Sequence, residues 1–288
     1  MPADLWRTLA PPVSRAGTRQ DGLPVGDSKK VFAGRRLEPL ERSVLAFARW
    51  RAGVPLPHCG ELMRVLAPAA EPWPRECPWY LDRPLKLPLE ADAKLVELMA
   101  GLLLRNAERK GVELLELQAE AVLEPEYNRR LVTTGNKLDV VFDRTLDLIG
   151  RALDLAPEGG AMVHVDRQGG LQRYGKRLAT GLGCSVEVIA ESKARSRYRV
   201  RRPGQSEPSE VAFSVRGEES SLSVALASMT SKYVRELYMT KLNHYWAERC
   251  PGLKPTAGYP ADATRFLAEI EDQIQREGID QTTLIRQR

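Results

Sequence analysis

Apolar residues recur every three or four positions in six stretches of the chain, the spacing that puts them on one face of an α-helix. Polar turns and proline- or glycine-containing breaks separate these stretches, the clearest being Pro157-Glu158-Gly159-Gly160. Helices usually end at such breaks. The pattern predicts helices over residues 37–51, 90–109, 136–153, 171–181, 222–249 and 261–276.

Shorter apolar or alternating runs are typical of β-strands. They fall at residues 112–122, 161–165, 184–190, 195–200 and 210–216. Strands and helices therefore alternate in the middle of the chain, whereas its end is helical. That order favours an α/β domain with a largely helical C-terminal part.

Residues 53–88 interrupt the pattern because they are rich in proline, which forbids a long helix or a central strand. We interpret this segment and the helix after it (53–109) as an insertion within a single domain that spans the chain. Trp73, Trp79 and Tyr80 could stack on bases, but we favour a role in pinning the insertion to the domain.

Composition narrows the class of protein. Hydrophobic residues make up 43% and charged residues 28% of the 288 positions, which is usual for a globular protein. The four cysteines form no Cys-x-x-Cys pair and only three histidines accompany them. We therefore expect reduced thiols rather than a zinc site. With no signal-peptide core and no apolar run of bilayer length, we expect a cytoplasmic protein without a membrane partner.

Positive charge is concentrated in one part of the chain. The net charge is +5, and residues 167–202 contain ten basic residues against two acidic ones. So local an excess is a candidate phosphate-binding surface, although a solvated face that binds nothing is the alternative. Arg195, Arg197 and Arg199 are our candidates for nucleic-acid contacts within it.

Asp166 follows a short apolar strand and precedes Gly169-Gly170. Carboxylates at strand ends of an α/β sheet point into the crevice where ligands bind. An aspartate in a turn after a strand can also be purely structural.

A second strand runs into Gly217-Glu218-Glu219 and then into a helix start crowded with hydroxyl groups. One interpretation is close helix packing, with a serine cap and acids that favour the helix dipole. The other is a helix start whose carboxylate helps to hold a divalent metal and whose hydroxyls and Lys232 face phosphate. Both interpretations can hold together.

These segments, in this order, resemble the type 2 ribonuclease H (ribonuclease HII) family. That family has an Asp-Ser-Lys-Lys segment, which is present here as residues 27–30. It also has a strand ending in Val-Asp-Gly, matched by Val165-Asp166 with Arg167 in place of glycine. Asn136 and the helix after it also resemble the middle part of the family's sequences.

Two later motifs extend the resemblance. The family has a strand that ends in Lys-Gly-Asp, and a serine of an alanine-rich helix follows ten residues later. Here Arg216-Gly217-Glu218 matches the strand end and Ser228 matches the serine. The family's Gly-Tyr turn before the next helix is matched by Gly258-Tyr259. The resemblance covers residues 25–50 and 110–288.

The resemblance implies a ribonuclease H-like fold, with a mixed sheet flanked by helices and a helical C-terminal cap. It implies an endonuclease that cleaves RNA in RNA/DNA hybrids, or 5′ to a ribonucleotide embedded in DNA. The chemistry would be two-metal hydrolysis with Mg²⁺ or Mn²⁺. We expect a monomer whose partner is such a duplex.

Site roles follow from the same resemblance. Asp166 and Glu218 would be catalytic metal ligands, with Glu219 able to substitute. Tyr259 would stack near the ribose whose 2′-hydroxyl distinguishes RNA from DNA. The residues that would hold phosphates are Lys29, Lys30, Ser228 and Lys232.

The sequence departs from the family at its first motif. The family's mechanism needs four carboxylates, and an adjacent Asp-Glu pair before a Gly-Arg-Gly turn supplies two of them. No such pair precedes Asp27; only lone acids such as Asp4 and Asp21 do. We therefore weigh two hypotheses: a nuclease whose recorded start lies too far downstream, or a non-catalytic domain that binds RNA/DNA hybrids. An unrelated basic α/β protein remains a third.

Overall fold

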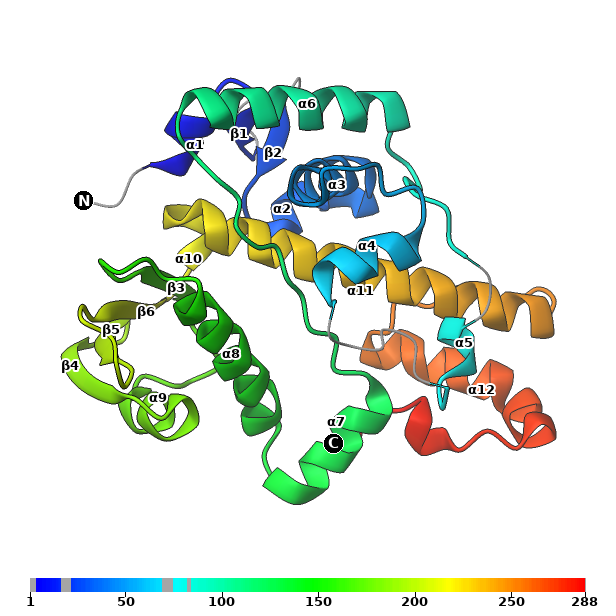
Figure 1. The fold of residues 1–288 in the computed structure, drawn as a ribbon. Helices are drawn as coiled ribbons and strands as arrows, with labels where there is room; N and C mark the ends of the chain where they lie inside the picture. Colours follow the sequence, from blue (N-terminus) through cyan, green and yellow to red (C-terminus); the bar gives the residue numbers. More distant parts are fainter. Residues whose placement is uncertain (1–3, 17–21, 69–74, 82–83, 288) are drawn as a thin grey trace.

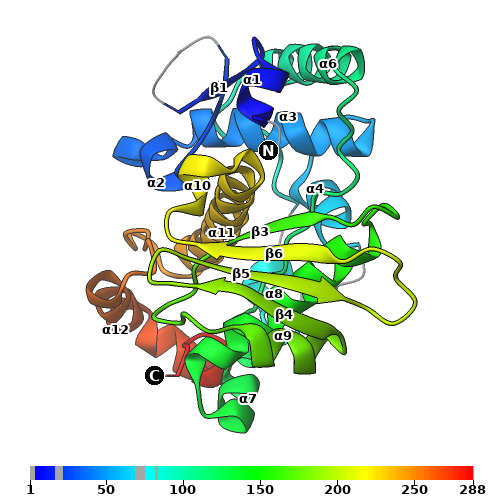
Figure 2. The same ribbon diagram turned by 90° about the vertical axis from the view of Figure 1, so that its left-hand side faces the viewer.

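The computed structural model describes residues 4–16, 22–68, 75–81 and 84–287. Its buried apolar side chains form two clusters. The larger one holds together a group of helices that we call the helical body, and the smaller one holds a sheet with two helices that we call the sheet lobe. Figures 1 and 2 show the sheet lobe beside the helical body, with the long helix α11 running through the latter.

The helical body combines the beginning and the end of the described chain. Its short parallel strands β1 and β2 are paired with each other. Helix α6 packs on α3, and α11 contacts α2, α3 and α5. The elements of the body are α1 (Leu5–Leu9), β1 (Val13–Arg15), β2 (Leu23–Val25), α2 (Ser28–Val31), α3 (Glu38–Ala52), α4 (Cys59–Leu66), α5 (Pro78–Leu81), α6 (Ala93–Arg109), α11 (Leu222–Arg249) and α12 (Pro260–Glu277).

Glu41, on α3, lies in the middle of this body and is fully buried. Its carboxylate accepts hydrogen bonds from the backbone N–H groups of Leu89, Glu90 and Ala91 at 2.7–2.8 Å. The hydroxyl of Tyr233, on α11, donates a fourth at 2.7 Å. Burial and the nearby carboxylate raise the pKa of Tyr233 well above its usual value. One carboxyl side chain therefore ties the segment before α6 to two core helices.

The sheet lobe contains a mixed four-stranded sheet in the order β3-β6-β5-β4. Strand β3 runs parallel to β6, whereas the β6–β5 and β5–β4 pairs are antiparallel. The elements of the lobe are α8 (Lys137–Asp154), β3 (Met162–Asp166), α9 (Gly175–Leu182), β4 (Ser185–Glu191), β5 (Arg195–Arg201) and β6 (Ser209–Ser214).

One face of this sheet forms the smaller core. The Tyr174 and Phe213 rings stack with centroids 3.7 Å apart, and Phe142 of α8 lies 5.8 Å from the Tyr174 ring. Tyr198 of β5 meets both Tyr174 and Phe213 edge-on. Because side chains alternate along a strand, this arrangement sends the residues between the core positions to the opposite face.

That opposite face carries charged side chains in register. Asp166 of β3, Ser214 of β6 and Arg195 of β5 are successive register partners, as are His164, Ala212 and Arg197 in the next row. In Figure 2 the four strands lie side by side with α8 behind them, so this face is turned toward the viewer. Helices were expected to flank the sheet. Helices α8 and α9 cover one face of it, while the other face is largely exposed.

Most predicted elements are confirmed, with two corrections. Residues 112–122, predicted as a strand, are extended but lie in neither sheet. In place of a neighbouring strand, this segment packs on the helical body, where Leu117 is buried and Ala119 N–H donates to Leu66 C=O. Helix α7 (Glu124–Thr134) was not anticipated; Pro125 in its first turn and Gly135 at its end (φ +64°) delimit it.

The proline-rich segment is more ordered than expected. It contains the eight-residue helix α4, and Trp79 and Tyr80 are buried in the larger cluster. These two side chains therefore pin the segment, as expected, whereas Trp73 lies outside the described residues. Within the described part of the chain, no helix is both long and apolar enough to cross a membrane.

Candidate functional site

The Asp-Ser-Lys-Lys segment lies against α11. Asp27 caps α2 by accepting the Lys29 N–H at 2.9 Å, and the Lys29 and Lys30 side chains are exposed. The Ser228 hydroxyl of α11 donates to the Ser28 hydroxyl at 3.0 Å, although 200 residues separate the two serines. The Asp-Ser-Lys-Lys segment and the alanine-rich helix, two motifs of the resemblance, are therefore in contact.

Gly26 explains how the chain enters this contact. A Cβ atom added at Gly26 would lie 2.6 Å from the Ala16 Cβ, so no larger residue fits without displacing the first strand pair. The Gly26 N–H donates to the Met229 sulfur at 3.5 Å, one residue after Ser228. The close approach places the start of α2 directly on α11.

Lys232 lies one helical turn beyond Ser228 on α11. Its ammonium group is 4.5 Å from the centre of the Phe32 ring, just after α2. It also forms an ion pair with Glu236 at 2.8 Å, which partly neutralises its charge. Lys232 thus lies beside the residue that follows α2, and a phosphate bound to its ammonium group would compete with the Glu236 carboxylate.

Asp166 lies at the junction of the two regions, in contact with Gly217, the residue before Glu218. The Asp166 carboxylate accepts the Gly217 N–H at 3.2 Å, which links the end of β3 to the short helix α10 (Gly217–Ser220). Arg216, just before α10, has φ +54°, a left-handed conformation that is strained for a residue with a side chain. Such strain is typical of functional segments whose shape the surroundings impose.

Arg15 connects the N-terminal segment to the same junction. Its guanidinium donates to the Glu219 C=O at 2.8 Å and stacks over the Trp6 ring at 3.8 Å. Glu219 itself is exposed, and Glu218 is half-buried. The N-terminal strand pair, β3 and α10 therefore converge at one place.

The described residues place too few carboxylates at this junction for a two-metal site. Among the described residues, no group of three or more Asp, Glu, His or Cys side chains is arranged to hold a metal ion. Asp4 and Asp27 serve as caps of α1 and α2, and Asp21 lies outside the described residues. Asp166 and Glu218 could contribute to one hard-cation site completed by water or phosphate oxygens, but the described residues do not fit two cations.

The basic candidates on β5 share the exposed sheet face with Asp166. Arg195 lies in the same row as Asp166 with one strand between them, which is about 10 Å at normal strand spacing. Arg197 forms a bidentate pair with Glu210 at 2.6 and 2.8 Å, which lowers the pKa of Glu210, and Arg199 pairs with Glu187. No such carboxylate pair holds Arg195 among the described residues.

Other basic residues of the 167–202 cluster also have acidic partners. Arg177 pairs with Asp139, and Arg202 pairs with Asp154, both on α8. Arg167 donates to three backbone carbonyls, those of Leu171, Lys193 and Gly170. The cluster is therefore less positive in space than its sequence composition indicates.

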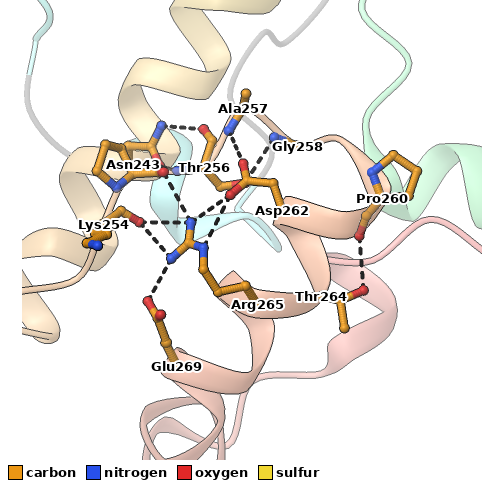
Figure 3. Close-up of polar contacts among 11 residues, drawn as sticks. Asn243, Lys254, Thr256, Ala257, Gly258, Pro260, Asp262, Thr264, Arg265 and Glu269 are labelled. Atoms are coloured by element: carbon orange, nitrogen blue, oxygen red, sulfur yellow. Dashed lines mark hydrogen bonds and ion pairs between the residues drawn. The ribbon is translucent and has the colours of Figure 1, made fainter.

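Tyr259 lies in a separate part of the surface, at the start of α12. Its side chain is 56% exposed, and the Arg235 guanidinium of α11 lies 5.4 Å from the centre of its ring. Beside it is a groove of about 630 Å³, lined in part by Arg235, Gly258, Pro260 and Phe266. Hydrogen bonds hold the turn that carries Tyr259 (Figure 3).

Sequence reasoning missed three residues that organise these contacts: Arg15, Arg235 and Asp262. Arg15 and Arg235 bind backbone carbonyls of distant segments, Glu219 and Ala257, and leave no local signal. Asp262 does have one, because an acid at the third position of a helix often accepts hydrogen bonds from the residues before it.

Comparisons with protein-family models, with curated proteins and with solved structures find no significant match for this chain.

Proposed function

We propose that the chain is a type 2 ribonuclease H protein that recognises RNA/DNA hybrids or DNA containing a ribonucleotide. In this proposal the fold is ribonuclease H-like, and the duplex lies over the exposed sheet face and along α11. Lys29, Lys30 and Arg195 contact phosphates. Tyr259 stacks near the ribose that marks the RNA strand.

The observation that carries the proposal is the convergence of motifs that are far apart in sequence. The Ser28–Ser228 hydrogen bond joins two of them, and the Asp166–Gly217 hydrogen bond joins two more. A chance match of short motifs gives no reason for these segments to pack in pairs. A shared binding surface does.

Hydrolysis is the second part of the proposal. Asp166 and Glu218 are metal ligands for Mg²⁺ or Mn²⁺, which would supply charge neutralisation at the scissile phosphate. The described residues provide two of the four carboxylates that two-metal cleavage needs. We therefore expect residues 1–288 to bind the duplex without cleaving it.

The test is to measure both properties on the same purified chain. Fluorescence anisotropy should show tighter binding to an RNA/DNA hybrid than to the DNA duplex of the same sequence. Incubation of a DNA duplex that contains one ribonucleotide with Mg²⁺ or Mn²⁺ should leave it intact. Equal affinity for hybrid and DNA would refute the recognition proposal.

Metal-dependent cleavage that is lost in Asp166→Asn would instead show that two-metal hydrolysis is complete in this chain. It would mean that acids such as Asp4, Asp21 or Asp27 supply the missing ligands. The amide keeps the shape of the side chain but lacks the charge that holds a hard cation, so hybrid binding should survive the change.

The phosphate contacts have a matched control. Replacing both Lys29 and Lys30 by Ala should reduce the slope of log affinity against log salt by about 1.4–1.8, since each lost contact accounts for about 0.7–0.9. Lys86 and Lys94 are also exposed but lie elsewhere on the helical body. Replacing both of these by Ala removes the same charge and should leave the slope unchanged.

A further inference from the structure

Hydrogen bonds around one carboxylate, that of Asp262, hold the turn before α12 (Figure 3). Asp262 Oδ2 accepts the Thr256 hydroxyl at 2.8 Å and the Ala257 N–H at 2.7 Å. The Thr256 hydroxyl in turn accepts the Gly258 N–H at 2.9 Å. Asp262 is thus connected, directly or through one hydroxyl, to the three residues that precede Tyr259.

Arg265 fixes the other side of the same carboxylate. Its guanidinium donates to Asp262 Oδ1 at 2.8 Å and also to the backbone carbonyls of Lys254 and Pro255 at 3.2–3.3 Å. Together with the Thr256 and Ala257 donors, this guanidinium lowers the pKa of Asp262 to about 2. The carboxylate therefore stays charged at any physiological pH, and both of its oxygens remain hydrogen-bond acceptors.

Two residues of α11 hold the turn from the opposite side. The Asn243 side chain exchanges hydrogen bonds with both the N–H and the C=O of Thr256, at 2.8 and 2.9 Å. Arg235 donates to the Ala257 C=O at 2.5 Å while its guanidinium faces the Tyr259 ring. A Cβ atom at Gly258, where φ is +72°, would lie 3.3 Å from that guanidinium. The backbone here is consequently fixed between two helices.

The contrast lies in the side chain that this fixed backbone carries. Tyr259 is more than half exposed, although several hydrogen bonds fix the backbone of the three residues before it. A base or sugar that stacks on an aromatic ring already held in place does not have to restrict the ring's motion. Binding then loses less conformational entropy, which increases the affinity for the nucleic acid.

We infer that Asp262 is a positioning residue, which fixes the turn so that Tyr259 presents its ring to the ribonucleotide of a bound duplex. This inference rests on the proposed function and adds to it a residue that sets specificity. Asp262 touches no substrate atom; it acts through Thr256, Ala257 and Gly258.

The test measures specificity rather than stability. Affinities are determined by anisotropy, in EDTA, for a DNA duplex with one central ribonucleotide and for the all-DNA duplex, and their ratio is compared between variants. Tyr259→Ala should lower the ratio by roughly fivefold or more, the size of one lost stacking contact. Asp262→Asn should lower it by roughly threefold or more, with affinity for all-DNA duplex unchanged.

A double-mutant cycle separates positioning from an independent effect. In the Tyr259→Ala background, Asp262→Asn should cause no further loss of the ratio, because its effect passes through the absent ring. Asp272 lies on the same helix, is exposed and takes no part in the turn, so Asp272→Asn is the matched control and should leave the ratio unchanged.

The outcomes keep the two proposals apart. A fall in the ratio for Tyr259→Ala but not for Asp262→Asn overturns the positioning role alone. If Asp262→Ala proves too unstable to purify, the Asn variant still decides the question because it keeps the side-chain volume. A wild-type ratio near one, or a ratio that Tyr259→Ala does not change, refutes the role of Tyr259 in the proposed function.

Discussion

The helical body and the sheet lobe place polar groups in opposite ways. In the body, the Glu41 carboxylate is fully buried and accepts four hydrogen bonds, three from the backbone and one from Tyr233. In the lobe, the Arg197–Glu210 and Arg199–Glu187 pairs lie on a sheet face that is open to solvent. The first arrangement stabilises one packing of helices, while the second leaves charges where a ligand can reach them.

The candidate site lies where these two regions meet. Asp166 comes from the lobe, Ser28 and Ser228 come from the body, and α10 contacts both β3 and α11. The body supplies a rigid support, and the lobe supplies a charged surface that can exchange its ion pairs for phosphates. Three predictions test this division of roles.

The largest expected effect concerns the buried carboxylate. Glu41→Gln puts an amide NH₂ group against the N–H groups of Leu89, Glu90 and Ala91, and should lower the free energy of unfolding by about 3 kcal/mol or more. Urea denaturation measures it. Glu187→Gln, the same change on the sheet face, should have a much smaller effect, because both members of the Arg199–Glu187 pair are exposed and exposed ion pairs contribute little. If both changes lowered the free energy of unfolding equally, the proposed difference between the two regions would be wrong.

A smaller effect is expected from Arg195. Arg195→Ala should reduce the slope of log affinity for hybrid against log salt by about 0.7–0.9, the value for one lost phosphate contact. Arg197→Ala should reduce this slope by less, because Arg197 and Arg199 must break their ion pairs with Glu210 and Glu187 before they can bind phosphate. Titrations at several salt concentrations measure these slopes. If replacing all three arginines by Ala leaves the slope unchanged, the sheet face is a solvated surface and phosphates bind elsewhere.

The smallest effect concerns His164, in the row next to Asp166. Burial, and then the nearby Arg195 charge, lower the pKa of His164 below its usual 6.5. The unfolded chain therefore takes up this proton first, so the histidine makes the protein less stable as the pH falls from about 6.5 toward the folded-state pKa. His164→Gln should remove this part of the pH dependence.

The same histidine reports on the bound state. Phosphates placed over Arg195 and Arg197 would favour the protonated ring, so the NMR titration midpoint of His164 should rise when hybrid is added. A midpoint that stays the same would place the duplex away from this face, even if binding itself is tight.

The sequence by itself determined the elements whose signals are local. Helical periodicity located α3, α6, α8, α11 and α12 to within a few residues, because an apolar stripe must be buried wherever the helix ends up. The strand ending at Asp166 was equally clear. Residues 112–122 show the limit of this reasoning, since alternation predicts an extended chain but cannot supply a neighbouring strand.

Only the tertiary structure decided which distant groups meet. The acids that neutralise the basic cluster include Asp139, Asp154 and Glu210, which lie outside the stretch in which its charge was counted. The Ser28–Ser228 contact and the hydrogen-bonded turn before Tyr259 likewise join separate helices. Electrostatic and hydrogen-bond energies depend on distance in space, which the order of residues along the chain does not contain.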